Sequence, residues 1–523
     1  MKLVDRLPLL PLVVAIASVT SMTSVASTAS AQDAQPQSKQ VAQATGTPGA
    51  APEAPATPET VPPAQTPVTT QVQQPPATSS SSSSASSSAA GAEEEKLPPG
   101  TFKIPGTRTT LTLSGYAQLD ITYDFRGRDP NVEGNDYAAH AANIPLNDSY
   151  ESKEKRNQLY LTARTSRIGF STNTPTDFAD IGVKIEADFV AGNLLSGQTF
   201  TNSVLFRLRH AYGTLSGKYG TLLVGQSWST FLDLPSVADT VDFNGPATVP
   251  LIRQPQVRYT IPLGGPFTAA IAAENAPGTD YNGTVDAGHS NGGRGSASNR
   301  RVQTIPDIIA VVGASGNWGS FSIAGVTMNY RNASREATAA TPTNPAVPAA
   351  DGYNKQGWGA RASGALKLPW GDTLRGNVAG GNGIGRYLFN AGLAGQGATA
   401  TDTSFVLWQA LGYHVNYTRV WSPMFRSNVT WAQTYFKNNG QGPYEPSAAS
   451  PDPGVNQRID ELFINTFITV NKQVEFGLEY IFGERRTFGL EQDAAGQSCG
   501  TGVGCQKVGT NHRIGASAHF NFF

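Results

Sequence analysis

The sequence predicts an all-β protein, a 16-stranded antiparallel transmembrane β-barrel with long extracellular loops and short periplasmic turns. Only 15% of the 523 residues are charged, against about 25% in soluble domains. From residue 100 to the end, apolar and polar residues alternate in segments of roughly ten or more residues, which is long enough for a tilted strand to cross a bilayer. Short and long connections alternate between these segments, as in outer-membrane barrels.

Two further regions precede the barrel. Residues 1–31 read as a signal peptide, because Lys2 and Arg6 flank an apolar stretch and Ala29-Ser30-Ala31 offers small residues for cleavage. Residues 32–99 are rich in Pro, Ala and Ser and contain no aromatic residue. Such a segment cannot bury enough apolar surface to offset the entropy of ordering, so we expect a disordered periplasmic segment before the barrel of residues 100–523.

The first strand sets the pattern for the others. Leu113, Leu119 and Phe125 share one face with other apolar residues, whereas Asp120 and Asp124 share the opposite face. An even number of such segments lets both ends of a single chain meet on one side of the membrane. The sixteen expected strands cover residues 111–125, 157–170, 179–190, 204–215, 220–228, 255–263, 266–275, 306–316, 319–331, 357–368, 373–386, 404–420, 424–436, 457–470, 473–484 and 511–523.

The connections have the chemistry of turns on one side and of long polar loops on the other. Short connections such as 263–266 and 316–319 contain the Gly, Pro and Asn residues that tight turns require. Trp318, Trp370 and Trp421 lie at such turns, where interfacial aromatic belts are expected. The chain ends on Phe523 after an alternating strand, so we expect barrel-assembly machinery to recognise this terminus.

Alternation also predicts which side chains face the lumen. Placing a guanidinium on the lipid face costs about 2–4 kcal/mol at the membrane midplane, so the arginines should point inward. Alternatively, each arginine forms a salt bridge with a lumen carboxylate and serves only to stiffen the wall. The expected basic ladder comprises Arg164, Arg207, Arg209, Arg258, Lys184, Arg361, Arg375, Arg426 and Arg513.

Two positions need separate comment. Arg167 breaks the alternation, which a bulge near Thr165 or a covering subunit interface would explain. Cys499 and Cys505 lie close together in the last long loop, and in an oxidising compartment we expect a disulfide between them.

One long loop, residues 229–254, is too apolar for a free surface loop. We expect it to fold into the lumen and form a constriction, with packing against a neighbouring loop at the rim as the alternative. Its carboxylates, Asp233, Asp239 and Asp242, could then face Arg164, Arg207, Arg209 and Arg258 across the pore. A guanidinium ladder of this kind binds carboxylates in bidentate fashion, and each contact must stay weak if the solute is to pass.

Several classes of partner are not expected. The net charge of −1 provides no basic excess for nucleic acid. The six histidines lack a metal-binding spacing, and the glycines at 381, 383 and 385 do not precede a helix, so we expect no metal and no cofactor.

Ordered motifs over residues 100–263 resemble DcaP-like porins. They include the strings FKIPGT, SRIGF, EADF, RHAYG, VGQSWS and RQPQVRY at residues 102–107, 166–170, 186–189, 209–213, 224–229 and 253–259. The resemblance implies a homotrimeric channel in the bacterial outer membrane that is associated with dicarboxylate uptake.

The sequence therefore predicts a porin for passive diffusion of small anionic solutes, dicarboxylates in particular, and not an enzyme. A sugar-specific channel is the alternative within transport, although a run of lumen aromatics is lacking. A barrel lipase or protease is a further alternative, and it would use a pair such as Ser517 and His519.

Overall fold

The computed structural model describes the barrel and part of its loops. The described residues are 97–126, 141, 144–148, 152–153, 156–191, 205–275, 281–282, 302–340, 346, 348–388, 397–400, 404–437, 456–488 and 506–523. The expected signal peptide, almost all of the segment expected to be disordered, and Cys499 and Cys505 lie outside these residues. Among the described residues, no helix has the length and hydropathy needed to cross a bilayer.

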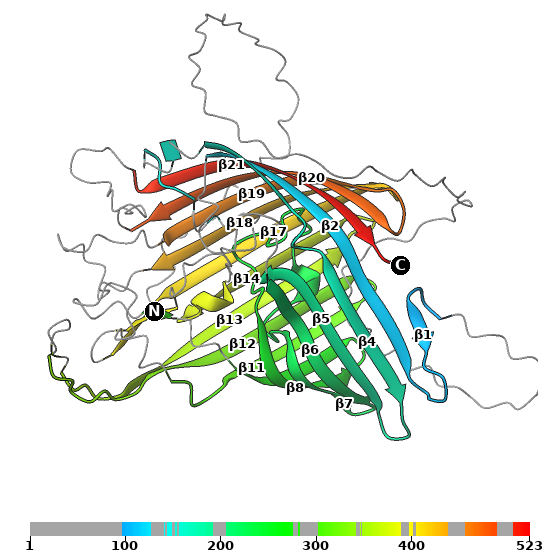
Figure 1. The fold of residues 1–523 in the computed structure, drawn as a ribbon, viewed down its shortest axis with the longest axis horizontal. Helices are drawn as coiled ribbons and strands as arrows, with labels where there is room; N and C mark the ends of the chain where they lie inside the picture. Colours follow the sequence, from blue (N-terminus) through cyan, green and yellow to red (C-terminus); the bar gives the residue numbers. More distant parts are fainter. Residues whose placement is uncertain are drawn as a thin grey trace, which may run out of the picture. The chain divides into compact units, whose positions relative to one another are not determined.

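Sixteen antiparallel strands form a closed barrel, as the sequence predicted (Figure 1). The first strand, β2, pairs with the last, β21, through partners that run from Tyr116 and Asn521 to Asp124 and Arg513. The strands are β2 (Thr110–Arg126), β3 with β4 (Arg156–Thr162, Arg167–Pro175), β5 (Asp180–Ala191), β6 (Leu205–Gly217), β7 (Gly220–Trp228), β8 (Arg253–Gly264), β9 (Phe267–Glu274), β11 (Asp307–Gly316), β12 (Gly319–Asn332), β13 (Tyr353–Lys367), β14 (Thr373–Asn382), β17 (Gln409–Ser422), β18 (Phe425–Lys437), β19 (Asn456–Thr469), β20 (Val474–Thr487) and β21 (Val508–Asn521).

The second barrel strand is interrupted. Its halves β3 and β4 both pair with β2, and the strand is broken over residues 163–166. This irregularity lies where a bulge near Thr165 was expected, and beyond it Ile168 and Phe170 are exposed on the outer face. Arg167 consequently points inward, where its Nε lies 3.5 Å from Glu186 Oε1.

Short elements lie outside the barrel wall. The strand β1 (Thr101–Lys103) forms a hairpin with the start of β2. Three strands in the loops form a second small sheet, β10 (Tyr281–Asn282), β15 (Ala398–Ala400) and β16 (Phe405–Leu407). Two single 3-10 turns, η2 (Leu234–Ser236) and η4 (Gly385–Tyr387), occur in the loops that follow β7 and β14.

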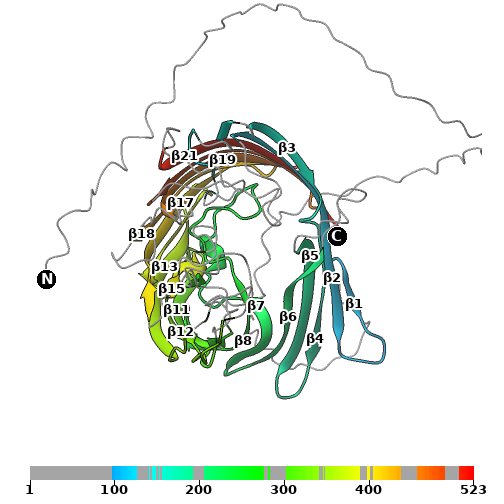
Figure 2. The ribbon, with the colours of Figure 1, turned by 60° about the vertical axis from the view of Figure 1, so that its left-hand side comes forward.

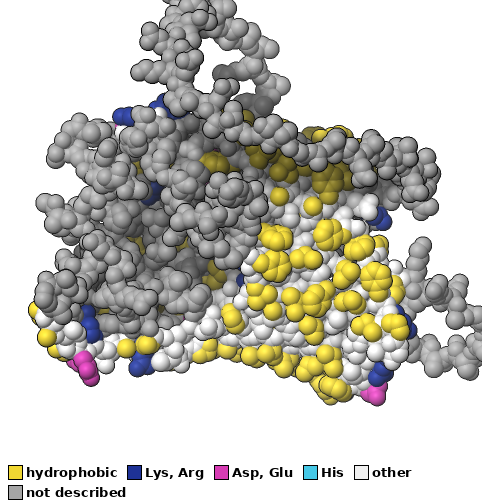
Figure 3. Space-filling model, viewed as in Figure 1, with side chains coloured by type: hydrophobic (Ala, Val, Ile, Leu, Met, Phe, Trp, Pro, Cys, Tyr) yellow, Lys and Arg dark blue, Asp and Glu magenta, His cyan; other side chains and the backbone are white. Residues whose placement is uncertain are grey.

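The barrel is apolar outside and polar inside. On β2, Leu113, Leu119 and Phe125 are exposed, whereas Asp120 and Asp124 are buried. Figure 3 shows hydrophobic side chains covering the outer face on the side of β2 and β4–β8, with charged side chains at its margins. Soluble proteins have their apolar residues inside and their polar residues outside. The reverse distribution seen here suits a wall that has lipid on one side and water on the other.

Apolar side chains also gather inside the barrel. The cluster includes Phe231 from the loop after β7, Tyr387 and Leu388 from the loop after β14, and Ile309 and Met328 from the wall. Phe231 and Tyr387 have ring centroids 5.2 Å apart, and the Tyr387 hydroxyl donates to Asp307. Two loops therefore pack together against the inner wall, mainly along β11–β14.

Candidate functional site

Residues 229–252, between β7 and β8, run through the interior of the barrel. Figure 2 shows this segment as the green trace that follows β7 and lies within the curved wall. Phe231, Ala247 and Val249 of the segment are at most 2% exposed. We call residues 229–252 the constriction loop.

Three wall glutamates hold the backbone of the constriction loop. Glu274 on β9 accepts the Thr230 N–H at 2.6 Å, and Glu461 on β19 accepts the Ala247 N–H at 2.6 Å. Glu479 on β20 accepts two N–H groups, from Val241 at 3.0 Å and from Asp242 at 2.7 Å. A loop that cannot pair its N–H groups in a sheet thus finds acceptors in the wall, as buried backbone donors require.

A histidine and several glycines complete this support. His414 on β17 bonds at both ring nitrogens, to Thr248 Oγ1 and to the Ser236 carbonyl, each at 2.9 Å. A Cβ atom at Gly477 would lie 2.6 Å from Val241 Cγ2, and one at Gly359 would lie 2.6 Å from Ile384 Cδ1. Wall glycines therefore occur where inward-folded segments approach most closely.

The loop carboxylates contact arginines of the wall along which the loop runs. Asp233 Oδ2 lies 3.9 Å from Arg361 Nη1 on β13 and accepts the Ser363 hydroxyl at 2.7 Å. Asp239 pairs with Arg426 on β18 at 2.8 Å. Asp242 Oδ2 lies 3.6 Å from Arg513 on β21, whose guanidinium also bonds Asp124.

The path of the loop, which follows the wall from β13 to β21, brings these three carboxylates to Arg361, Arg426 and Arg513. That Asp233, Asp239 and Asp242 oppose Arg164, Arg207, Arg209 and Arg258 across the pore stays a prediction.

The opposite wall carries a dense basic cluster on β4–β6. Arg207 donates two hydrogen bonds to Asp188, at 2.8 and 2.7 Å. Arg209 bridges Glu186 and Asp188, each at 2.7 Å. Arg167 and Lys184 also reach Glu186, at 3.5 and 3.3 Å. Four cations therefore share two carboxylates, and the cluster retains positive charge. We call these six residues the basic cluster.

The tip of the constriction loop reaches this cluster. The Phe243 ring centroid lies 5.9 Å from the Arg207 guanidinium and 5.7 Å from that of Arg209, within the range of cation–π attraction. The passage at this level is therefore bounded by cations on β4–β6 and by the loop tip.

Two arginines of β8 have no carboxylate partner within the part of the chain that the structure describes. Arg253 stacks on Trp228, with its guanidinium carbon 3.4 Å from the ring centroid, and its buried Nε lacks a hydrogen-bond partner. Arg258 lies further along the same strand and forms no ion pair. An arginine held on an aromatic ring keeps its charge and most of its donors available.

The sequence did not single out Arg253 as a lumen residue. Counting back from Val257, which is exposed, alternation would place Arg253 on the lipid face. Arg253 is the first residue of β8, directly after the constriction loop, and it lies beside the basic cluster, because the Trp228 ring that it stacks on is also 6.0 Å from the Arg209 guanidinium. Arg253 lies directly opposite Trp228, at the end of β7, and this pairing becomes known only from the register of the two strands.

The other candidate residues are distributed around the wall. Arg164 is buried in the turn between β3 and β4. Arg375 on β14 donates to neutral partners, Asn416 at 3.2 Å and Thr418 at 2.6 Å. Arg426 also pairs with Glu475 at 2.6 Å. Arg426 therefore has two carboxylate partners, whereas Arg375 bonds neutral groups.

A metal site and a catalytic Ser–His pair have less support among the described residues. No group of three or more His, Cys, Asp or Glu residues in that part of the chain is arranged to hold a metal ion. His519 bonds Gln118 through Nδ1 and Asn521 through Nε2, each at 3.0 Å, and its neighbour across the strand is Tyr116, with ring centroids 4.1 Å apart. Both ring nitrogens are engaged by amides rather than by Ser517.

Comparisons with known proteins agree with this geometry. Residues 95–288 match the family model of the DcaP outer membrane protein. The outer membrane channel DcaP of Acinetobacter baumannii is 22% identical, with a TM-score of 0.59, and the match covers 80% of this chain and 99% of that chain. An anion-selective porin from Comamonas acidovorans is 13% identical, with a TM-score of 0.44, over 79% of this chain and 100% of the other. A search of the curated proteins finds no match.

The family match spans the strands that carry the basic cluster, Arg253 and Arg258, together with the whole constriction loop. The fold of the A. baumannii channel extends over the complete barrel. Over residues 95–288 the chain is therefore similar to the DcaP outer membrane protein family, and its barrel has the fold of an outer-membrane channel.

Proposed function

We propose that this porin passes small anionic solutes by diffusion and favours dicarboxylates over monocarboxylates. The observation that supports this most directly is Arg253, a guanidinium that lies flat on Trp228 without a carboxylate partner among the described residues. Arg258 on the same strand provides a second such group. Arg209 of the basic cluster also lies at the Trp228 ring, 6.0 Å from its centroid, so one carboxylate of a solute would meet Arg253 and the other the basic cluster, whereas a monocarboxylate would engage only one of them.

The basic cluster supports the same proposal through its excess charge. Since Glu186 and Asp188 are shared by four cations, an approaching anion would meet a positive wall beside Arg253. The carboxyl groups beside the constriction loop would keep each contact shallow, because a solute that binds tightly does not pass.

The test is planar-bilayer conductance with reversal potentials measured in asymmetric salt. Arg253→Gln should lower the preference for anions by a factor of about five, the effect of roughly 1 kcal/mol of lost attraction in a partly solvated lumen. It should also relieve block by a dicarboxylate such as succinate. Arg486→Gln is the matched control, because Arg486 pairs with Glu484 on the outer face.

The measurement is made at low salt, where screening extends over about 30 Å at 0.01 M. Unchanged selectivity in Arg253→Gln would show that the β8 arginines do not face the solute. Replacing Arg207 and Arg209 by Ala is less decisive, since that change would leave Asp188 unpaired and favour cations for that reason alone.

We also propose that the channel assembles as a homotrimer and that Phe523 contributes to recognition by barrel-assembly machinery. Crosslinking in native outer membranes would reveal a ladder ending at three subunits. Deletion of Phe523 should lower the amount of folded barrel without changing the conductance of the channels that do assemble.

A further inference from the structure

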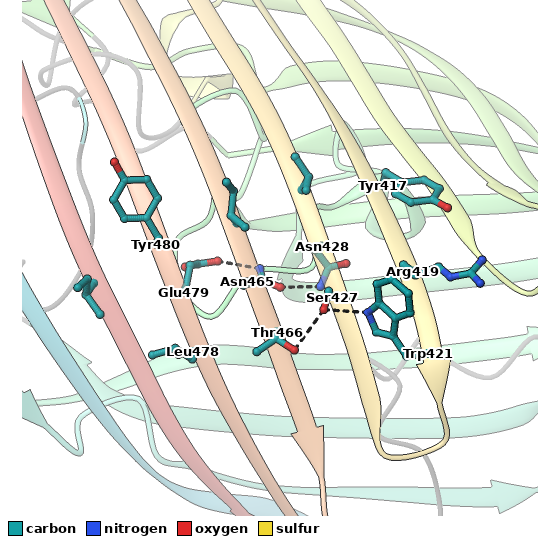
Figure 4. Close-up of a pocket in the computed structure, with 13 residues that line it drawn as sticks. Tyr417, Arg419, Trp421, Ser427, Asn428, Asn465, Thr466, Leu478, Glu479 and Tyr480 are labelled. Atoms are coloured by element: carbon teal, nitrogen blue, oxygen red, sulfur yellow. Dashed lines mark hydrogen bonds between the residues drawn. The ribbon is translucent and has the colours of Figure 1, made fainter. Parts of the chain in front are cut away.

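A groove of about 820 Å³ lies across β17–β21 of the barrel wall (Figure 4). Most residues that line it point outward, so the groove opens toward the membrane rather than the lumen. Its volume is within the range of about 300–1,000 Å³ that is typical of small-molecule sites. The outward-facing lining residues are Tyr417, Arg419, Trp421, Ser427, Val429, Ile464, Thr466, Leu478, Tyr480 and Ile514.

The floor of the groove is made of small side chains between large ones. Ser427 and Thr466 lie on adjacent strands with their hydroxyls 3.2 Å apart, and Ser427 also accepts the Trp421 Nε1–H at 3.1 Å. Leu478 and Trp421 on the two sides are 55% and 65% exposed. Because the floor hydroxyls are already hydrogen-bonded, the groove presents an apolar channel to its occupant.

One end of the groove carries a fixed positive charge. Arg419 lies three residues before the end of β17, close to the periplasmic turn that joins β17 to β18. Its Nη1 donates to Asp372 at 2.8 Å, and its guanidinium carbon lies 5.3 Å from the Trp421 ring centroid. Among the described residues, Asp372 and Tyr417 are the side chains that hydrogen-bond Arg419, so most of its five donors remain open.

Asp372 holds this arginine without using up its remaining donors. The carboxylate also accepts the Tyr417 hydroxyl and, at 3.1 Å, the Val420 N–H. Arg419 is therefore fixed in direction by a carboxylate whose oxygens are both engaged. A guanidinium that is fixed in this way, with free donors, fits a phosphate.

We propose that the groove binds a glycerophospholipid of the periplasmic leaflet, with its phosphate on Arg419 and one acyl chain over Ser427 and Thr466. The order of the charged end and the apolar part along the groove favours this occupant. The charge lies at the periplasmic end, beside the interfacial residue Trp421, and the apolar part continues toward the membrane centre. A lipid of the opposite leaflet would have its headgroup at the wrong end.

The test uses the complete protein, reconstituted in vesicles of phosphatidylethanolamine and phosphatidylglycerol that contain a phospholipid with a photoactivatable acyl chain. After illumination, mass spectrometry locates the labelled peptides. We expect labelling to concentrate on residues around Ser427 and Thr466. Arg419→Gln should reduce this labelling by about tenfold, the factor supplied by one charge-assisted hydrogen bond.

Further variants separate binding from folding. Thr466→Trp fills the floor and should abolish the labelling, whereas Arg419→Lys should retain part of it because the charge remains. Arg486→Gln, at the extracellular end of β20, should have no effect. All variants must keep the electrophoretic mobility of the folded barrel and the wild-type conductance.

Three results would overturn the proposal. Labelling spread evenly around the barrel would mean that the groove is ordinary lipid-facing wall. Labelling that disappears in Thr466→Trp but persists in Arg419→Gln would exclude a phosphate at the arginine. Protein–protein crosslinks from a photoreactive residue placed at Leu478 would show that a second copy of the chain covers the groove.

Discussion

Glu479 is the wall residue that engages the most backbone donors of the constriction loop. Its carboxyl group accepts the N–H groups of Val241 and Asp242 and the side-chain amide of Asn465. Because these donors are buried, removing the Glu479 carboxyl group would leave each of them without an acceptor that water could replace. Glu479 therefore helps to hold the loop in the lumen.

We predict that Glu479→Ala lowers the free energy of unfolding by about 1–3 kcal/mol for each donor left unpaired. The loosened loop should also increase the noise of single-channel currents. Glu479→Gln should cost less, because its carbonyl still accepts one N–H. The control is Glu336→Ala in the exposed loop after β12; equal effects in Glu336→Ala and Glu479→Ala would contradict the prediction.

Asp372, in the turn between β13 and β14, has an unusual acidity. Removing the Asp372 carboxyl from water would by itself raise its pKa. Hydrogen bonds from Tyr417, Arg419 and the Val420 N–H outweigh this effect and lower the pKa from 3.8 to about 2. The ionised carboxylate therefore stabilises the folded turn at neutral pH.

The pH dependence follows from the direction of this shift. Since the folded-state pKa is depressed, the stabilisation is complete above the unfolded value of 3.8 and is lost as the pH falls toward about 2. We predict that Asp372→Asn is less stable than wild type at neutral pH and that the difference shrinks between these two values. Urea unfolding in detergent at a series of pH values measures it, and a difference that stays constant down to pH 2 would argue against the assignment.

At the scale of elements, the constriction loop and the wall fit closely. A Cβ atom at Gly477 would lie 2.6 Å from Val241 Cγ2 and 2.8 Å from Ser517 Oγ, whereas nothing lies within 4 Å of one at Gly515. We predict that Gly477→Val destabilises the barrel by about 1–3 kcal/mol through overpacking, and that Gly515→Val does not. Thermal unfolding of both variants tests this, and similar melting temperatures would refute it.

The strands could be predicted from the sequence because lipid and water impose a strict alternation on each of them. Leu159 and Leu161 are 59% and 50% exposed in the structure, as a lipid face requires. The inward folding of the apolar loop was also predictable, since the Phe231 side chain needs burial and is 0% exposed. Both inferences use only local sequence.

Ion pairing could not be predicted in the same way, because it depends on which residues of neighbouring strands lie opposite one another. Arg209 reaches both Glu186 and Asp188 because the register between β5 and β6 shifts after Glu186. Alternation gives the face of a side chain but not its partner. The same limit explains why the contact of Asp239 with Arg426 and the stacking of Arg253 on Trp228 emerged only from the structure.

At the scale of the whole molecule, the described barrel makes contacts at its two ends that do not involve residues before 97. The Leu113 N–H donates to the Gly100 carbonyl at 2.9 Å. A Cβ atom at Gly100 would lie 2.7 Å from Phe523 Cδ2, so the start of the barrel packs beside the end of the chain.

We therefore predict that a chain lacking residues 32–96, in which the expected signal peptide of residues 1–31 directly precedes Leu97, folds and conducts like the full-length protein. Removing β1 as well should lower stability, since Thr101–Lys103 would no longer pair with β2. Planar-bilayer recordings and heat-induced shifts in electrophoretic mobility measure both effects. A folded chain from Leu97 that lacks conductance would show that the preceding residues take part in the pore.

Closure of the barrel through β2 and β21 has a consequence for biogenesis. Tyr116 cannot meet Asn521 until nearly the whole chain has been synthesised and exported, so the edge of β2 that β21 covers stays open throughout delivery. Such distant pairings form slowly, and an uncovered strand edge recruits other chains in the meantime. A nascent polypeptide of this topology must be escorted across the periplasm, and an arrest before Val508, which removes all fourteen residues of β21, would leave two edges exposed and a product prone to aggregation.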